Sequence, residues 1–326
     1  MTKLDPWQRE MIRGLFPYSG GRLRIEEAFA TKFPHIPAKL YKYRDFSNSY
    51  HKQALECDQQ WFSSPDNFND PFDTVANFKS DKLPRQRQTL EECLAEVELI
   101  RATEAKGGKW IASPITDPIS VEQWRKEVLE PLTLQLPKEH QDIFRAMLRS
   151  SNEDLNDELV SGTSAFLRNG FSALSLSADP TSNLMWSHYS ASHKGFCIEY
   201  DFGSLPYSDL RKRMCFPVFY RKKRTDSTRY FSQARADFNP AVGIYLCLMK
   251  GAEWSYEQEW RIVHAIGPAD ANRLYAMPPP SALIVGACVG TADLEYAQSF
   301  CHSRAIPLRQ ARLKSDSLSV TVSELS

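Results

Sequence analysis

Strand-like and helix-like segments follow one another in this chain without a regular strand–helix–strand rhythm, and that irregularity constrains the fold most. Two highly charged stretches with helical spacing, Leu83 to about Ala105 and Val121 to Val160, interrupt the segments that have strand character. A doubly wound parallel sheet requires a strict alternation of strands and helices. The pattern therefore predicts an α+β fold with a mixed sheet and a helical insertion at about residues 80–165.

Alternation of apolar and polar residues, together with turn formers, predicts the other elements. The expected strands cover residues 40–44, 60–63, 170–177, 195–201, 215–220, 254–264 and 282–286. The expected helices cover residues 51–58, 181–192 with Thr181 as N-cap, 231–250 with an interruption near Pro240, and 291–303. Residues 1–39 are expected to form a helical or irregular N-terminal leader, residues 40–326 a single domain, and the tail after residue 306 one edge strand.

The charge balance excludes a global attraction to polyanions. Lys plus Arg and Asp plus Glu each number 40, so any contact with nucleic acid or an anionic membrane must be a local patch. No apolar run is long enough to span a bilayer, and the N-terminus lacks the apolar region of a secretory signal, so we expect a cytoplasmic protein without membrane contact. The seven cysteines form no C-x-x-C pair, which favours reduced thiols over a disulfide framework and disfavours a cysteine zinc site.

The string Trp254-Ser-Tyr-Glu-Gln-Glu-Trp-Arg261 is the most informative one. On a strand, Glu257, Glu259 and Arg261 would project from one face. Two neighbouring carboxylates beside a guanidinium can divide labour, one orienting a substrate and the other stabilising developing positive charge. The alternative is a solvated strand face with a surface ion pair.

The strand expected over residues 170–177 places Ser175 and Ser177 on one face, where small hydroxyl side chains would let a ligand approach the backbone. Ordinary serines near a strand end are the alternative. The segment contains no Gly-x-Ser-x-Gly elbow, so a hydrolase-type nucleophile is disfavoured.

The helix expected after Pro180 carries Trp186, Tyr189 and His193 in one stripe. Such a stripe belongs to a core more often than to a cofactor site, but buried polar tips would need partners, for which Asn69 and Asp70 are candidates. These two residues lie in the turn-rich segment from Ser64 to Phe72, which we expect to be an ordered loop anchored by its two phenylalanines.

Four separated strings resemble the bacterial family catalogued as domain of unknown function 2971. They are Leu40–Arg44, Trp61–Pro65 with Phe68–Phe72, Leu184–Tyr189 with His193–Tyr200, and Trp254–Arg261. The resemblance spans about residues 39–265, with a typical closing strand at 283–286.

A more distant likeness connects the chain with ADP-ribosyltransferases of the Arg-Ser-Glu type. Those enzymes hold the NAD phosphates with an arginine on the first core strand, shape the nicotinamide pocket with a serine strand, and use a Glu-x-Glu for transfer. Arg44, the pair Ser175 and Ser177, and Glu257-Gln-Glu259 stand in that order here. The likeness implies a split β-sheet core. The aromatic residue that would stack on nicotinamide has three candidates: Tyr43, Trp186 and Tyr189.

The resemblance implies an NAD-dependent ADP-ribosyltransferase-like enzyme, such as a toxin or phage-defence effector, with NAD as substrate and no metal. In that hypothesis Glu259 stabilises the ribose cation, Glu257 orients the acceptor and Arg44 binds the diphosphate. The acceptor would be a protein or a nucleic acid, and an antitoxin or regulatory partner could control the enzyme. The alternative is a non-catalytic ligand-sensing or regulatory protein, in which the same residues form a buried polar network.

Overall fold

An eight-stranded sheet forms the centre of the computed structural model, which describes residues 4–79, 85–86, 89, 91–92, 95, 118–119, 121–135, 170–231, 237–265 and 273–325. The strand order is β14-β13-β12-β6-β1-β5-β10-β7, and all neighbours are antiparallel except β12 and β13. The strands are β1 (Lys39–Arg44), β5 (Phe171–Ser177), β6 (Phe196–Asp201), β7 (Cys215–Pro217), β10 (Glu259–Ala265), β12 (Ala282–Val285), β13 (Leu308–Leu313) and β14 (Val320–Glu324). The α+β class with a mixed sheet is confirmed.

The sheet is split between β1 and β5. Six register pairs join β1 to β6, and seven join β10 to β5, whereas β1 and β5 share the single pair Tyr41 and Ser177. Two groups of strands therefore meet at one point and separate on either side of it.

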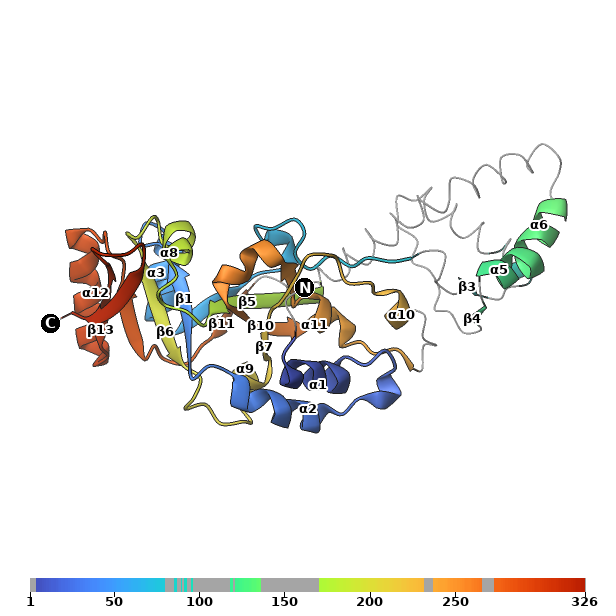
Figure 1. Cartoon of the computed structure of the whole chain (residues 1–326), viewed down its shortest axis with the longest axis horizontal. Coiled ribbons are helices and arrows are strands. Elements are labelled where there is room, and N and C mark those ends of the chain that lie inside the picture. Colours follow the sequence, from blue (N-terminus) through green and yellow to red (C-terminus); the bar gives the residue numbers. More distant parts are fainter. Residues whose placement is uncertain are drawn as a thin grey trace.

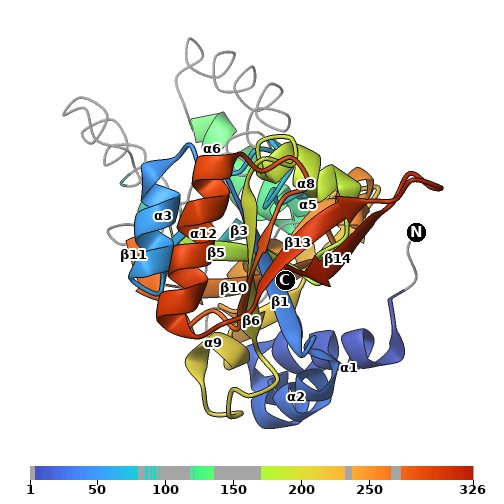
Figure 2. The ribbon, with the colours of Figure 1, turned by 90° about the vertical axis from the view of Figure 1, so that its left-hand side faces the viewer.

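Helices α3 (Ser49–Glu56) and α12 (Thr291–Arg304) lie side by side over one face of the β1–β6–β12 group (Figure 2). Lys52 forms an ion pair with Asp293 between them, at 3.1 Å. The alternation of β1 sends Leu40 into the core beneath these helices and Tyr43 into a smaller cluster on the opposite face, where α8 (Asn183–Tyr189) packs.

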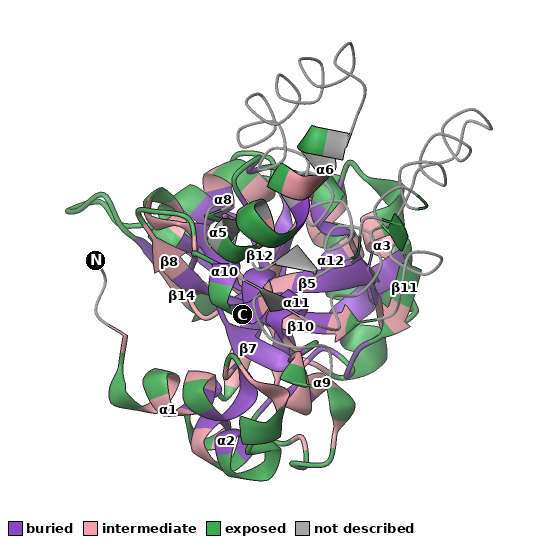
Figure 3. Cartoon of the chain, turned by 90° about the vertical axis from the view of Figure 1, so that its right-hand side faces the viewer, coloured by how far each residue is buried: buried purple, intermediate pink, exposed green. Residues whose placement is uncertain are grey.

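The N-terminal residues pack against the central sheet and supply part of a buried cluster. Helices α1 (Pro6–Leu15) and α2 (Ile25–Lys32) pack against each other at the lower edge of the molecule in Figure 1. Met11 and Phe29 join a buried cluster that also contains Phe216 of β7. Figure 3 shows the buried strands β5, β7 and β10 between these and other, more exposed helices. The residues expected to form a leader thus supply part of the core.

Shorter elements complete the described chain. They are β2 (Gln59–Phe62) paired with β11 (Arg273–Ala276), β8 (Phe219–Arg221) paired with β9 (Met249–Gly251), β3 (Arg85–Gln86) paired with β4 (Pro118–Ile119), and the helices α5 (Val121–Trp124), α6 (Glu130–Gln135), α9 (Leu210–Arg213), α10 (Thr228–Phe231) and α11 (Val242–Leu246). Most of the expected insertion at 80–165 lies outside the described residues, although 121–135 is helical. No helix in the described ranges is long and apolar enough to cross a membrane.

Several expected elements were wrong in type or extent. The strand expected over residues 215–220 is divided into β7 and β8, which belong to different sheets. The helix over residues 231–250 is replaced by α10, α11 and β9, because Asn239 and Pro240 form a turn before α11. The Asn239 side chain donates to the carbonyl oxygens of Leu15 and Pro17 and accepts from the Ala241 amide, which fixes that turn. The C-terminal tail supplies two strands, β13 and β14, rather than one, and β13 adds to β12 in parallel.

Candidate functional site

A cavity of about 820 Å³ lies where the sheet splits. Its walls include residues 41–44 of β1 and 173–177 of β5, and the loop that precedes Asp73. Arg44, Ser177 and Glu259, which are far apart in the sequence, all line this one cavity. The structure thus brings together the three residue types that the sequence placed on three strands.

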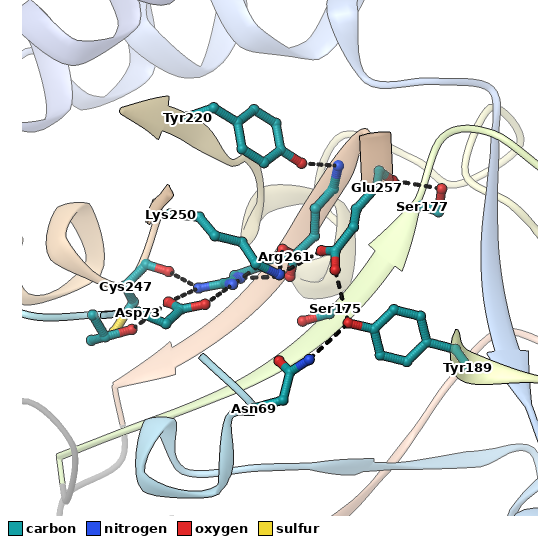
Figure 4. Close-up of polar contacts among 12 residues, drawn as sticks. Asn69, Asp73, Ser175, Ser177, Tyr189, Tyr220, Cys247, Lys250, Glu257 and Arg261 are labelled. Carbon is teal, nitrogen blue, oxygen red and sulfur yellow. Dashed lines mark hydrogen bonds and ion pairs between the residues drawn. The ribbon is translucent and has the colours of Figure 1, made fainter. Parts of the chain in front are cut away.

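Arg261 is the centre of a buried ion network at the base of the cavity (Figure 4). Its guanidinium donates to both carboxylate oxygens of Asp73, at 2.8 and 2.6 Å, and to both oxygens of Glu259, at 2.7 and 3.1 Å. A fifth bond goes to the Cys247 carbonyl oxygen at 2.6 Å. Paired hydrogen bonds of this kind fix orientation as well as charge. Arg261 therefore sets the position of Glu259 rather than forming a surface ion pair.

Lys250 of β9 connects the two glutamates. Its ammonium group lies 2.5 Å from Glu257 Oε2 and 2.9 Å from Glu259 Oε2. All three side chains are buried. The network of Lys250, Arg261, Asp73, Glu257 and Glu259 contains three carboxylates and two cations, so it retains one negative charge when all five groups are ionised.

The strand expected over residues 254–264 was wrong in its first half. Residues Ala252–Glu257 form a 3₁₀ helix, Gln258 adopts a left-handed conformation with φ of 44°, and β10 begins at Glu259. Glu259 and Arg261 still share a strand face, but Glu257 reaches the cavity from the helix. The carboxylates of Glu257 and Glu259 come close to each other because the chain turns at Gln258, and not because they alternate along one strand.

The two glutamates have opposite pKa shifts. Burial and the nearby Glu259 carboxylate raise the pKa of Glu257 above its ordinary value. Burial alone would raise the pKa of Glu259, but Arg261 and Lys250 outweigh it and lower that pKa well below its ordinary value. Two carboxylates with diverging pKa values are typical of sites in which one stays ionised and the other exchanges protons.

Tyr189 joins the network to the turn-rich loop. Its hydroxyl donates to Glu257 Oε1 at 2.8 Å and accepts from Asn69 Nδ2 at 3.0 Å (Figure 4). The expected pairing with Asn69 is confirmed. Asp70 instead accepts from the Phe72 amide at 2.9 Å within its own turn. Burial and Glu257 raise the pKa of the Tyr189 hydroxyl.

The turn-rich loop makes contacts with the rest of the site, but only one of its two phenylalanines packs on the core. Phe68 packs on the buried cluster, and its ring lies 4.8 Å from the Arg261 guanidinium carbon. Phe72 is 63% exposed, so its expected anchoring role was wrong. The turn closed by Asp70 directs the residue after Pro71 outward.

The serines of β5 lie on the cavity wall. Ser175 hydrogen-bonds the Glu259 side chain and helps to lower its pKa. Ser177 is buried, and its hydroxyl donates to the Glu257 carbonyl oxygen at 2.7 Å. Both serines therefore hold the two glutamates in place.

Cationic groups of β1 also line the cavity. Lys42 donates to the Ser175 carbonyl oxygen at 2.7 Å across the split, and Arg44 donates to Gln60 Oε1 at 2.6 Å. Burial, then Arg44, lowers the pKa of Lys42 well below its ordinary value, and burial lowers the pKa of Arg44 to about 10. The Arg44 Nε atom is buried and has no hydrogen-bond partner among the residues that the structure describes. This part of the lining thus presents two cationic groups whose charged forms are disfavoured by burial, and one buried N–H donor that is available to a ligand.

The aromatic candidates separate into core and cavity. Trp186 is fully buried, donates to the Pro180 carbonyl oxygen at 2.8 Å and packs edge-on against Tyr43. Tyr43 reaches the cavity wall, but its hydroxyl is bound to the Asp179 carbonyl oxygen. Tyr189 lines the cavity. Trp186 therefore belongs to the core, which was one of the two interpretations of the helical stripe.

The helix that carries Trp186 is shorter than expected. It begins at Asn183 with Ser182, not Thr181, as its N-cap, because the Ser182 hydroxyl accepts from the Met185 amide. Thr181 instead bonds the Asp179 carboxylate. His193 lies beyond the helix with φ of 66°, although its ring stacks on Trp186.

Sequence reasoning missed three site residues. Lys42 shares a strand face with Arg44, and that alternation could have revealed it. Asp73 and Lys250 reach the site through contacts between distant segments, for which local spacing gives no signal.

Comparison with known proteins adds one similarity. A family described as "Protein of unknown function (DUF2971)" matches residues 185–262, a shorter segment than the expected 39–265, which includes residues 185–189 of α8 together with Lys250, Glu257 and Glu259. The chain is similar to that family over this segment, as the sequence motifs indicated. No curated protein and no solved structure matches the chain. The likeness to ADP-ribosyltransferases is not supported by these comparisons.

Proposed function

We propose that this chain binds NAD in the split-sheet cavity and transfers ADP-ribose to a macromolecular acceptor. The observation that carries the proposal is the distribution of charge along the cavity. Lys42 and Arg44 line it from β1, here called the β1 wall, and Glu257 and Glu259 line it from the 3₁₀ helix and β10, here called the glutamate wall. NAD combines an anionic diphosphate with a ribose at which positive charge develops during cleavage, so the two walls match its two reactive features.

The β1 wall suits the diphosphate. Arg44 has an unpaired Nε donor, and a planar guanidinium binds phosphate oxygens in pairs. An anion bound beside Lys42 would favour the charged form of that amine and offset the effect of its burial. The cavity volume of about 820 Å³ also lies in the range of small-molecule sites.

The glutamate wall suits the chemistry. The bond between ribose C1′ and the nicotinamide nitrogen breaks, and the electron pair leaves with nicotinamide. The negative charge retained by the ion network, with Glu259 held ionised, stabilises the ribose cation. The acceptor attacks C1′ and loses a proton to Glu257, whose raised pKa makes it the better base. Ser175 and Ser177 brace the pair, and Tyr189 is the aromatic group available to nicotinamide.

A non-catalytic ligand-sensing or regulatory protein is the second candidate, and one observation favours it. Both oxygens of Glu259 already accept hydrogen bonds from Arg261 or Lys250, as in a purely structural network. In the enzymatic proposal the chain acts as a toxin or phage-defence effector, with an antitoxin or regulatory partner. In the sensing alternative, NAD or a related ligand binds without being consumed.

The test is calorimetric NAD binding together with nicotinamide release by the full chain. We expect Arg44→Ala to weaken NAD binding, while Arg312→Ala, at an exposed position on β13, leaves it unchanged. Binding without release would support the sensing alternative. Absence of both binding and release for the wild type would contradict NAD as ligand.

A further inference from the structure

We infer that the acceptor is a single-stranded nucleic acid held by a basic surface beside the cavity. This inference rests on the proposed function and names the acceptor class for the same site. The surface, here called the basic edge, consists of Lys222, Lys223, Arg224 and the exposed ring of Phe72.

The basic edge begins next to the candidate site. Strand β8 ends at Arg221, and the Tyr220 hydroxyl accepts a hydrogen bond from the Glu259 amide at 2.8 Å. Its partner strand β9 carries Lys250 of the ion network. A polymer bound along residues 222–224 would therefore pass close to the two glutamates.

The charges of this run remain available. Lys222, Lys223 and Arg224 are all exposed, and the two lysines form no ion pair with any residue that the structure describes. The next carboxylate along the chain, Asp226, is held by Lys79 at 3.1 Å. Exposed cations that are not neutralised locally are what a phosphate backbone requires. Because the net charge of the chain is zero, a polyanion would have to be attracted by such a local patch.

Phe72 supplies the second feature of a single-strand site. Its ring is 63% exposed, and the turn closed by Asp70 and Pro71 fixes its backbone. The Arg224 guanidinium carbon lies 5.5 Å from the ring centroid, which places charge and aromatic surface together. An aromatic ring beside a basic track is the arrangement on which unpaired bases stack. The same loop places Asn69 in the cavity wall, so the ring and the cavity are connected.

The combination favours nucleic acid over protein. An acidic peptide would use the positive charges, but it gains little from an exposed, rigid phenylalanine. A single strand uses both, with phosphates on the lysines and a base on the ring. A base or sugar of that strand would then supply the nucleophile that attacks ribose C1′.

The experiment measures binding of a fluorescent single-stranded oligonucleotide of about 12 nucleotides, within the usual site sizes, by anisotropy over a range of salt concentrations. The full chain is compared with a Lys222→Ala, Lys223→Ala, Arg224→Ala triple variant and with Phe72→Ala. The matched control is Arg312→Ala with Lys314→Ala, which removes exposed charges at the opposite edge of the sheet. Circular dichroism confirms that each variant is folded.

For the triple variant we expect the slope of log K against log salt to fall by about 0.7 per lost contact. Phe72→Ala should weaken binding about 5- to 150-fold with the slope unchanged, as for a lost stacking contact. The control should bind like the wild type. An unchanged slope in the triple variant, or absence of wild-type binding at low salt, overturns the inference. Tight binding of polyglutamate that is insensitive to Phe72→Ala would overturn it in favour of a protein acceptor.

Nicotinamide release by the wild type is measured in parallel without oligonucleotide. Release without oligonucleotide binding would contradict the basic edge and leave the NAD proposal intact. Oligonucleotide binding that is lost in the triple variant, without any NAD binding by the wild type, would contradict the NAD proposal and leave the basic edge as a nucleic-acid site. The two proposals therefore fail separately.

Discussion

Arg261 and Asp73 form a two-point ion pair although 188 residues separate them in the chain. The pair is buried and ties the turn-rich loop to β10 beneath the cavity. Asp73 directly follows the turn-rich loop, so the ion pair holds the end of the loop whose Asn69 contacts Tyr189.

Asp73→Asn should therefore destabilise the protein strongly. The change removes one of the two carboxylates that pair with Arg261, while Glu259 remains as the other, and the loss of a hydrogen bond to a charged group costs about 1.5–3 kcal/mol. Urea unfolding measures the loss, and Asp66→Asn at an exposed position of the same loop is the control. Equal stability of the two variants would show that Arg261 does not need Asp73.

Glu259→Gln and Glu257→Gln should separate cleavage from transfer. Loss of the Glu259 charge should lower both NAD hydrolysis and ADP-ribose transfer by about 10²–10³, as for other lost electrostatic groups. Loss of Glu257 should lower transfer more than hydrolysis, because water needs less help from a base than a positioned acceptor. Each variant serves as the other's control in assays of nicotinamide release and acceptor labelling. Parallel losses in both variants would contradict the division of roles.

Tyr189→Phe should move the acid limb of the pH–rate profile to higher pH. The Tyr189 hydroxyl donates to Glu257 and lowers its pKa, so removal of that bond should raise the pKa further. A base must be deprotonated to act, and a higher pKa shifts the rise in activity upward. Tyr256→Phe, at a neighbouring half-buried tyrosine, is the matched control. An unmoved limb would remove Glu257 as the titrating base.

Phe72→Ala should change the free energy of unfolding by no more than about 0.5 kcal/mol, because the ring is mostly exposed. Phe62→Ala provides the contrast, since that ring is 1% exposed and its loss should cost about 3–5 kcal/mol. Thermal unfolding of both variants checks the pair. A large loss at position 72 would place its ring in the core after all.

Lys32 should make stability depend on pH. Its ammonium donates to the carbonyl oxygens of Lys212, Arg213 and Cys215, and burial lowers its pKa to about 7 from 10.5. Between these values the unfolded chain binds more protons than the folded one, so the free energy of unfolding rises with pH by up to about 1.4 kcal/mol per pH unit. Lys32→Met should lose this rise, and Lys194→Met, at an exposed position, should keep it. Identical pH slopes for Lys32→Met and wild type would contradict the shift.

The strand assignments predicted the parts of the site that are local. Residues 40–44 and 171–177 form strands as expected, and Arg44 and Ser175 on these strands line the cavity. A period of two also placed Glu259 and Arg261 on one strand face. The same rule failed for Glu257, because a left-handed residue at Gln258 interrupts the period and nothing in a glutamine signals that conformation.

Long-range charge pairing was beyond the reach of spacing arguments. Lys250 and Asp73 look like ordinary polar residues, and only the fold shows that each is buried against a charge from another segment. The exposure of Phe72 could not be predicted either, because an aromatic residue in a tight turn can face solvent as readily as the core.

The single register pair between β1 and β5 also determines how force passes through the molecule. A sheet with a full ladder resists shear along every residue, whereas here the two groups of strands are coupled at Tyr41 and Ser177 and by the Lys42 contact to Ser175. Sliding or spreading of one group against the other therefore breaks few hydrogen bonds. Resistance to such a motion therefore comes mainly from the buried side chains that the two groups share, such as Leu40 and Leu174, and both ladders can stay intact when the cavity width changes.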